Sequence, residues 1–302
     1  MNKKLISILG PTASGKSSLA FALAKKLQCP IISCDSMQNY RKLDIGSAKP
    51  SIDELKQIKH HMVDELDINQ SWTAAAFYEQ AEEIRLEHQK NEQALIMAGG
   101  TGLYAKMFLY GADTLPSDKT LAQEIRERYE QEGSTHIFAE LAKIDPLSAE
   151  KLKDNDRRML RAYEAAKLLN GPLPERSFAQ EPRFDCRQII LMPAAELSRE
   201  LIAKRCIKML SEGWIEEAQE LIQQGLLESP TACQALGYKE IQQFLLGALD
   251  RNELQERLII KTCQYAKRQR TWFRNQHPGA EVFTYQNSEE RELVFKTILD
   301  EF

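Results

Sequence analysis

Apolar residues in the first part of the chain fall into short blocks that alternate with helical patterns. Short apolar runs predict buried strands at residues 5–9, 30–33 and 94–98, and a later strand at residues 187–192. Apolar positions at helical spacing predict a helix over residues 18–27, and an amphipathic pattern predicts another over residues 73–89. This alternation predicts an α/β fold in which an open parallel sheet is flanked by helices on both faces.

The pattern changes from about residue 113 to residue 185, where charged helical segments alternate with polar turns. Helices are predicted over residues 120–131, 137–143 and 157–169. We interpret residues 113–185 as a helical insertion, so that residues 1–112 and 186–302 together form the domain that contains the sheet. Residues 198–274 are predicted to be helical, and a short strand at 282–285 precedes a final helix at 289–299.

Composition narrows the class of protein. The chain has 302 residues, of which 43% are hydrophobic and 28% charged, as in soluble globular proteins. No apolar run approaches the roughly 18 to 20 residues of a membrane span, and the N-terminus lacks a cleavable signal pattern. We therefore expect a cytoplasmic protein without a membrane anchor. The six cysteines form no C-x-x-C pair, which argues against a disulfide framework and a structural zinc site.

The segment GPTASGKS follows the first predicted strand and opens the first predicted helix. It matches the phosphate-binding loop G-x-x-x-x-G-K-[ST] through Gly10, Pro11, Thr12, Ala13, Ser14, Gly15, Lys16 and Ser17. The glycines let backbone N–H groups turn toward anionic oxygens, and the helix N-terminus adds its positive dipole end. Lys16 would place a positive charge on the terminal phosphate, and the Ser17 hydroxyl would coordinate Mg²⁺. A phosphorylated ligand is therefore expected.

Two further segments follow predicted strands and should lie at the same edge of the sheet. Asp35 follows residues 30–33 and is either a general base or the side chain of an Asx turn or helix N-cap. Thr101 lies in the glycine-rich segment AGGTGLY, which either approaches a ligand closely or forms a tight turn. The strand ALIMA ends without the second acid that usually holds magnesium in P-loop NTPases. Its absence weakens a kinase or ATPase interpretation and leaves room for a diphosphate leaving group.

The formal net charge of −4 gives no global reason to expect nucleic-acid binding, so local basic segments would have to provide it. Residues 261–274 contain five Lys and Arg residues and no acid, with Tyr265, Trp272 and Phe273 interleaved. This mixture suits unstacked bases and phosphates, although it also fits a solvated helix face above a hydrophobic core. The arginines at residues 157–161 and Arg205 are, by themselves, more typical of solvated helix surfaces.

Eight segments, taken in order, closely resemble the bacterial tRNA dimethylallyltransferase family, also called IPP transferases. They are GPTASGKS, DSMQNY, DIGSAKP, HHMVD, AGGTGLY, NDRRMLRAYE, ALGYKE and AKRQRTWFR, and they span nearly the whole chain. The resemblance implies transfer of a dimethylallyl group from dimethylallyl diphosphate to N6 of adenosine 37, beside the tRNA anticodon. It also implies that Asp35 is the general base and that Lys16, Thr101, Arg205 and Mg²⁺ on Ser17 act on the diphosphate.

The same resemblance implies a tRNA-facing surface and a clasp of the anticodon stem by the helical insertion. The residues implied to face tRNA are Asp35, Ser36, Met37, Gln38, Thr101, Arg157, Arg158, Arg161, Gln234, Ala235, Leu236, Gly237, Tyr238, Lys239, Lys267, Arg268, Gln269, Arg270, Thr271, Trp272, Phe273 and Arg274. Adenosine 37 would have to leave the loop stack to reach Asp35. We expect a monomer whose partners are the tRNA anticodon stem-loop and dimethylallyl diphosphate.

Some positions depart from the family pattern, and three other functions stay open. Ser17 and Ser47 stand where Thr is usual, and Ala122 and Gln123 stand where an Arg is expected. The alternatives are an adenylate isopentenyltransferase that acts on a free nucleotide, a P-loop small-molecule kinase, and a non-catalytic RNA-binding NTPase module. The insertion and the basic helical segment argue against a free nucleotide, and the missing second acid argues against the kinase.

Overall fold

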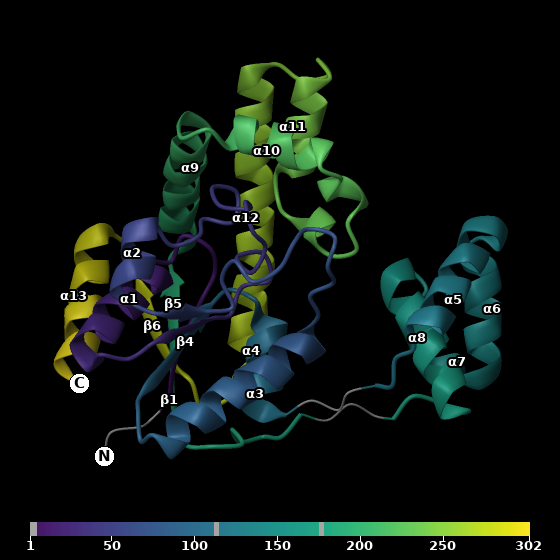
Figure 1. Ribbon diagram of the computed structural model, residues 1–302, viewed down its shortest axis with the longest axis horizontal. Helices are drawn as coiled ribbons and strands as arrows, with labels where there is room; N and C mark the ends of the chain where they lie inside the picture. Colours follow the sequence, from purple (N-terminus) through teal and green to yellow (C-terminus); the bar gives the residue numbers. More distant parts are fainter. Residues whose placement is uncertain (1–4, 112–114, 175–177) are drawn as a thin grey trace. The chain divides into compact units, whose positions relative to one another are not determined.

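The computed structural model describes residues 5–111, 115–174 and 178–302. Its six strands form one parallel sheet in the order β3-β2-β4-β1-β5-β6, flanked by helices (Figure 1). The strands are β1 (Leu5–Leu9), β2 (Ile31–Ser33), β3 (His60–His61), β4 (Leu95–Gly99), β5 (Cys186–Pro193) and β6 (Glu281–Tyr285). The predicted α/β class with a parallel sheet is therefore confirmed.

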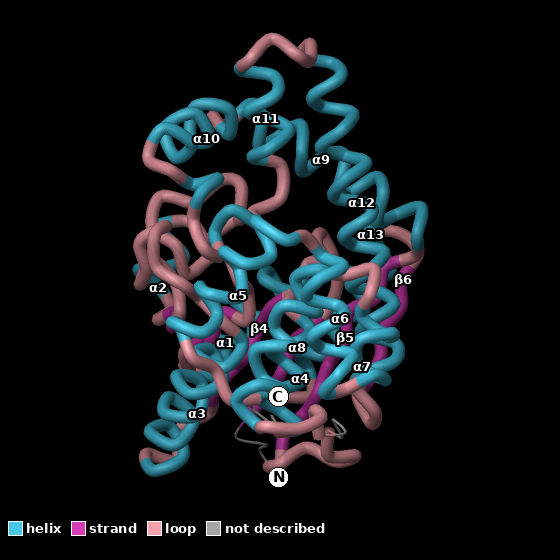
Figure 2. The backbone as a smooth tube through the Cα atoms, turned by 90° about the vertical axis from the view of Figure 1, so that its right-hand side faces the viewer, coloured by secondary structure: helices cyan, strands magenta, loops and turns pink. Residues whose placement is uncertain are grey.

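The chain divides into two compact units, one of residues 1–111 and 179–302 (unit 1) and one of residues 112–178 (unit 2). The helices of unit 1 are α1 (Lys16–Leu27), α2 (Ile52–Gln57), α3 (Ala74–Lys90), α4 (Gly102–Tyr110), α9 (Ala195–Ser211), α10 (Trp214–Gln223), α11 (Tyr238–Leu245), α12 (Arg251–Gln276) and α13 (Ser288–Asp300). Figure 2 shows their path along the backbone in a second view. Throughout the part of the chain that is described, no helix combines the length and apolar character needed to cross a membrane.

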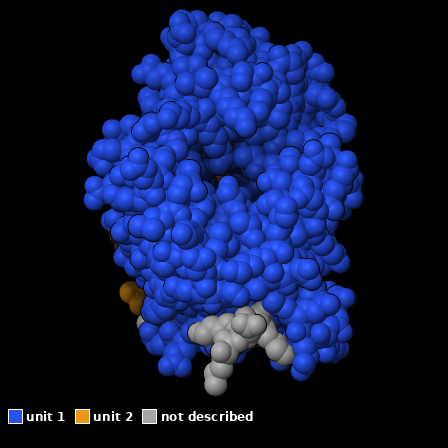
Figure 3. Space-filling view, turned by 90° about the vertical axis from the view of Figure 1, so that its left-hand side faces the viewer, with its two compact units in different colours: residues 1–111, 179–302 blue, residues 112–178 orange. Residues whose placement is uncertain are grey.

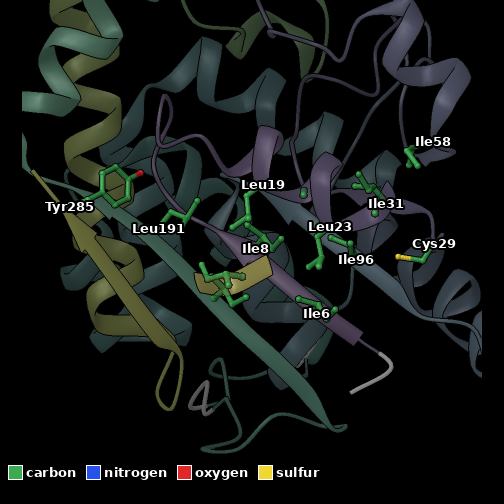
Figure 4. Packing of buried hydrophobic residues seen from close by; sticks show 14 of the residues in the cluster. Ile6, Ile8, Leu19, Leu23, Cys29, Ile31, Ile58, Ile96, Leu191 and Tyr285 are labelled. Atoms are coloured by element: carbon green, nitrogen blue, oxygen red, sulfur yellow. The ribbon is translucent and has the colours of Figure 1, made fainter. Parts of the chain in front are cut away.

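Alternation along the central strand creates the main core of unit 1. Ile6 and Ile8 of β1 point to one face of the sheet and are fully buried, as the period of two in a strand requires. Leu19 and Leu23 of α1 pack against them (Figure 4). α13 closes the same cluster through Ile298, so the end of the chain helps to hold α1 in place.

Unit 2 is the helical insertion between β4 and β5, and it has a core of its own. Its helices are α5 (Lys119–Glu132), α6 (Ser134–Ile144), α7 (Pro146–Leu152) and α8 (Asp156–Leu169). Ile125, Ile137, Leu141 and Tyr163 are almost completely buried against one another. The side chains of Asp118 and Asn155 cap α5 and α8 by accepting hydrogen bonds from backbone N–H groups.

Four elements are not among those that the sequence predicts: β3, α2, α4 and α7. β3 has only two residues, so it carries no alternation that could identify it. α2 has six residues and no buried side chain, which leaves it without a hydrophobic stripe. The segment predicted as one helical region, residues 198–274, contains four helices with short 3₁₀ turns at Leu226–Glu228 and Ala232–Gln234.

Candidate functional site

A pocket of about 310 Å³ in unit 1 opens where the strands end. In a parallel sheet all strand carboxyl ends meet at one edge, and β2, β4 and β1 are neighbours. The pocket is lined from these strand ends and from α9, α10 and α12, and Figure 3 shows unit 1 hollowed near the middle of one face. Of the predicted site, it is lined by Thr12, Lys16, Ser17, Asp35, Ser36, Met37, Gln38, Arg205, Gln234, Ala235, Leu236, Arg268 and Gln269.

The backbone of the phosphate-binding loop has positive φ angles at two glycines. Gly10 has φ +153° and a Cβ there would lie 2.5 Å from the Leu191 carbonyl oxygen, while Gly15 has φ +79°. The Tyr285 hydroxyl donates to the Ser14 carbonyl oxygen at 2.5 Å, which fixes the middle of the loop from β6. The side-chain oxygen of Gln269 accepts from the Thr12 N–H at 2.8 Å, so this one loop amide is directed at α12.

Two cations and the first residues of α1 line one end of the pocket, the cationic end. The Arg205 guanidinium donates to the Thr12 hydroxyl at 3.2 Å, and the Lys16 ammonium donates to the Pro11 carbonyl oxygen at 3.3 Å. Burial and the neighbouring charge of Arg205 lower the pKa of Lys16 from 10.5 to about 8, against a smaller opposing effect of Asp35. Burial likewise lowers the pKa of Arg205. This concentration of positive charge favours an anion in the pocket.

The predicted Asp35 lies in the turn that follows β2, where it forms the predicted Asx turn and also faces the pocket. Its Oδ1 accepts from the Met37 N–H at 2.9 Å, which is the Asx-turn bond, and the residue also lines the pocket. The Thr101 hydroxyl accepts from the Ser36 N–H at 3.1 Å. Thr101 thus supports the turn from the end of β4 and is not among the residues that line the pocket.

On the basic helix α12, some residues line the pocket, some are buried and some are exposed. Gln269 and Phe273 are 7% and 1% exposed, Trp272 packs on Gly102, and Arg270 donates to the Pro193 carbonyl oxygen. These side chains support the fold of unit 1, which agrees with the core interpretation of the two aromatic residues. Of the predicted tRNA-facing residues on the same helix, Lys267, Arg268, Thr271 and Arg274 are exposed.

The other predicted tRNA-facing segments show the same division. In the segment 234–239, Gln234 and Lys239 are exposed, whereas Ala235, Gly237 and Tyr238 are buried. In unit 2, Arg157 and Arg158 are exposed on α8. Arg161 instead donates to the carbonyl oxygens of Leu115 and Pro116 and to the Glu164 carboxylate, so its guanidinium joins α8 to residues 115–116.

Several lining residues were not singled out as site residues from the sequence. They are Gly46, Ser47, Ala48, Cys206, Met209, Trp214 and Thr262; Tyr265, which also lines the pocket, was named only as an aromatic residue of the basic segment. Met209 follows Arg205 four residues later, on the same face of a helix, so one signal existed for it. Burial and the charge of Asp35 raise the pKa of the Tyr265 phenol, which therefore stays protonated at neutral pH. These additional lining residues are therefore uncharged, in contrast to Lys16 and Arg205.

Comparison with known proteins agrees with this geometry. The IPP transferase family model matches residues 38–276. A tRNA dimethylallyltransferase from Acaryochloris marina is 36% identical over 99% of this chain and 98% of its own length, and tRNA dimethylallyltransferase 1 from Trichlorobacter lovleyi is 40% identical over 91% and 92%.

The structural comparison gives the same result. The crystal structure of the full-length tRNA isopentenylpyrophosphate transferase from Bacillus halodurans has a TM-score of 0.68 and 31% identity, covering 99% of this chain and 98% of that one. The predicted resemblance is therefore confirmed, and the chain belongs to the IPP transferase family, together with these tRNA dimethylallyltransferases.

Proposed function

We propose that this protein transfers the dimethylallyl group from dimethylallyl diphosphate to the exocyclic N6 of adenosine 37 in tRNA. The observation that carries the proposal is the pocket itself, which is lined by Asp35 together with Lys16, Ser17 and Arg205. A base and an anion cradle in one pocket suit a reaction in which an amine loses a proton while a diphosphate departs from carbon.

The diphosphate binds at the cationic end. The bond that breaks joins C1 of the dimethylallyl group to an oxygen of the diphosphate. Its electron pair passes to that oxygen, and negative charge builds on the departing diphosphate. Lys16 and Arg205 stabilise this charge from fixed positions, which lowers the barrier more than it strengthens substrate binding. The lowered pKa of Lys16 supports this role, because a bound anion relieves the repulsion between the two cations.

The residues at the start of α1 fit Mg²⁺ as an additional charge at this end. Mg²⁺ is usually held by one or two protein oxygens together with substrate phosphates and water. Ser17 is exposed and lines the pocket, and its hydroxyl would hold the ion. Mg²⁺ bound there would neutralise charge on the diphosphate. Among the described residues no cluster of three or more His, Cys, Asp or Glu could hold a metal, which is consistent with a site completed by the substrate.

Asp35 accepts the proton that N6 loses. The lone pair of N6 is delocalised into the purine ring, so removal of a proton as the N6–C1 bond forms makes N6 a better nucleophile. The Asx-turn bond from Met37 fixes Oδ1 and leaves the second carboxylate oxygen to take the proton. Adenosine 37 reaches this carboxylate by leaving the anticodon-loop stack, which costs about a few kcal/mol.

The exposed cations of α12 and α8 supply the contacts to tRNA phosphates. Lys267, Arg268, Arg274, Arg157 and Arg158 provide local positive charge on a chain whose net charge is −4. Unit 2 is the part that would clasp the anticodon stem. A free nucleotide acceptor would need neither group of residues.

Mass spectrometry of mixed reactions tests the proposal. The protein is incubated with Mg²⁺ and dimethylallyl diphosphate in the presence of an anticodon stem-loop RNA, AMP, or both. We expect the prenyl mass on the RNA at the adenosine in position 37 and none on AMP. Prenylated AMP without prenylated RNA would contradict this proposal and indicate an adenylate isopentenyltransferase. Turnover of ATP without use of dimethylallyl diphosphate would replace it with a kinase.

A further inference from the structure

We propose that Glu217 of α10 is a positioning residue that fixes residues 44–48 (the 44–48 loop) as one wall of the pocket. Only the expected effect on the rate of prenyl transfer rests on the proposed function. Glu217 does not line the pocket, whereas Gly46, Ser47 and Ala48 do. Its carboxylate therefore acts on the substrates through the loop.

The Glu217 carboxylate accepts four hydrogen bonds. Oε2 accepts from the N–H groups of Asp44 and Ile45 at 2.9 and 2.6 Å, and Oε1 accepts from the Gly46 N–H at 2.9 Å and from the Tyr238 hydroxyl at 2.5 Å. Successive backbone N–H groups that point at one anion form an anion-binding nest. Here the anion is a side chain of the same chain, about 170 residues away in sequence.

Close packing brings the loop against Trp214 of α10 and Tyr238 of α11. A Cβ on Gly46 would lie 2.1 Å from the Tyr238 hydroxyl oxygen and 2.4 Å from Nε1 of Trp214. A Cβ on Gly237, which has φ +96°, would lie 2.5 Å from Cζ2 of the same tryptophan. The two glycines thus let the loop and the start of α11 approach Trp214 closely.

The loop is in turn bonded to the turn that contains Asp35. The Gln38 side-chain amide donates to the carbonyl oxygens of Ser47 at 3.4 Å and Ala48 at 3.1 Å. Its own oxygen accepts from the Ser33 hydroxyl at the end of β2 at 2.7 Å. A displacement of the 44–48 loop would therefore reach both the pocket wall and the residues next to the proposed base.

Lys49, which directly follows the loop, makes a second set of contacts that joins it to Asp44 and Asp64. The Lys49 ammonium, on a side chain that is 4% exposed, contacts the carboxylates of Asp44 and Asp64 and donates to the Tyr40 carbonyl oxygen. These contacts give a structural role to the segments DIGSAKP and HHMVD. Because the Lys49 contacts remain, loss of the Glu217 bonds should leave the N–H groups of residues 44–46 without that partner but should not unfold the 44–48 loop.

Glu217→Gln tests the inference because it keeps the size of the side chain but replaces one accepting oxygen with a donor. Glu220→Gln is the matched control on the same helix: it changes only exposed contacts, which are the ion pair with Lys42, next to the same loop, and the hydrogen bond from the Gln224 side chain. Amide hydrogen exchange, followed by mass spectrometry on peptides that contain residues 44–46 and, separately, β1, gives a readout that does not depend on activity.

In Glu217→Gln we expect the amides of residues 44–46 to exchange about tenfold faster or more, with unchanged exchange in β1, because a hydrogen bond to a charged group contributes about 1.5–3 kcal/mol. We also expect kcat/KM for prenyl transfer to fall about tenfold or more. Glu220→Gln should match the wild type in both. Tyr238→Phe, which keeps the three amide bonds, should give a smaller loss of kcat/KM than Glu217→Gln.

Unchanged exchange at residues 44–46 in Glu217→Gln would overturn the inference. So would a kcat/KM equal to that of Glu220→Gln. Faster exchange in β1 as well would mean that Glu217 stabilises the whole of unit 1, and this would also overturn the positioning role. If the wild type transfers no prenyl group, the proposed function fails, and the exchange measurement still decides whether Glu217 fixes the loop.

Discussion

The side-chain oxygen of Gln269 accepts a hydrogen bond from the backbone N–H of Thr12 at 2.8 Å, although 257 residues separate them. The amide nitrogen of the same side chain donates to the Gly100 carbonyl oxygen, also at 2.8 Å. Gln269 is 7% exposed. One buried amide on α12 thus joins the phosphate-binding loop after β1 to the glycine-rich segment after β4.

Gln269→Leu should destabilise the protein and loosen the phosphate-binding loop. The substitution keeps a side chain of similar size but leaves two backbone groups without partners, and each such group costs about 1–3 kcal/mol when buried. Urea unfolding of the variant and the wild type measures this loss, and titration with dimethylallyl diphosphate measures the accompanying loss of affinity. Equal unfolding free energies would show that the two hydrogen bonds do not stabilise the loop.

A second prediction concerns proton uptake by Lys16. Its pKa of about 8 in the free protein means that the amine is largely neutral at about pH 9. A bound diphosphate raises that pKa, so binding should take up close to one proton at about pH 9 and much less at about pH 6. Calorimetry with dimethylallyl diphosphate in buffers of different ionisation enthalpy measures the uptake. Lys16→Met corrects for protons carried by the ligand, and equal uptake by this variant and the wild type would contradict the assignment.

The same pKa determines how stability depends on pH. Because the folded pKa lies below the unfolded value of 10.5, the unfolded state binds more protons between about pH 8 and 10.5. This group therefore makes the free energy of unfolding rise with pH in that window, and its unfavourable contribution is fully present below about pH 8. Lys16→Met should remove this rise and increase stability at neutral pH. A pH series of urea unfolding checks both, and a destabilised variant at pH 7 would contradict the prediction.

Arg205→Gln should weaken diphosphate binding and raise the pKa of Lys16. Arg205 is the largest charged contributor to the lowered pKa of Lys16. Its removal deletes a partly buried cation that faces the anion, a loss of about tenfold or more in donor affinity. The KM for dimethylallyl diphosphate and the pH at which proton uptake begins measure the two effects. A donor KM equal to that of the wild type would remove Arg205 from the anion site.

The arginines of unit 2 should separate into a structural and an RNA-binding group. Arg161→Met leaves the Glu164 carboxylate, 3% exposed, without its cation and should lower stability by about 1–3 kcal/mol. Arg158→Met should leave stability unchanged but reduce RNA affinity and its dependence on salt, because fewer counterions are released. Unfolding curves and RNA titrations at several salt concentrations distinguish the variants. Equal stability of Arg161→Met and wild type would be the contrary result.

The elements with local signals were those that the sequence could predict. The sequence could predict the phosphate-binding loop with its flanking strand and helix, because their formation depends on neighbouring residues. It could also predict which segments lie at one edge of the sheet, because they follow parallel strands. Asp35 carried two possible roles in the sequence, and the structure shows the Asx-turn bond and the pocket position together, which local pattern alone could not combine.

Long-range partners could not be predicted in this way. Glu217 lies in the segment WIEEAQELI, where acids at helical spacing are typical of a solvated face. Its hydrogen-bond partners at residues 44–46 come from a distant part of the chain, and no local sequence pattern predicts them. Gln269 stands within a strongly basic segment, so its buried contact with Thr12 was hidden among residues that face solvent.

The most direct test of the central claim is the single-turnover rate of prenyl transfer by Asp35→Asn, measured by mass spectrometry of an anticodon stem-loop RNA with saturating dimethylallyl diphosphate and Mg²⁺. Asparagine keeps the size of the side chain and an oxygen that can accept from Met37, but it cannot take the N6 proton. We predict that RNA binding stays close to that of the wild type while the rate falls by about 10²-fold or more, as expected for loss of a general base. A transfer rate like that of the wild type would contradict the assignment of Asp35 as the base.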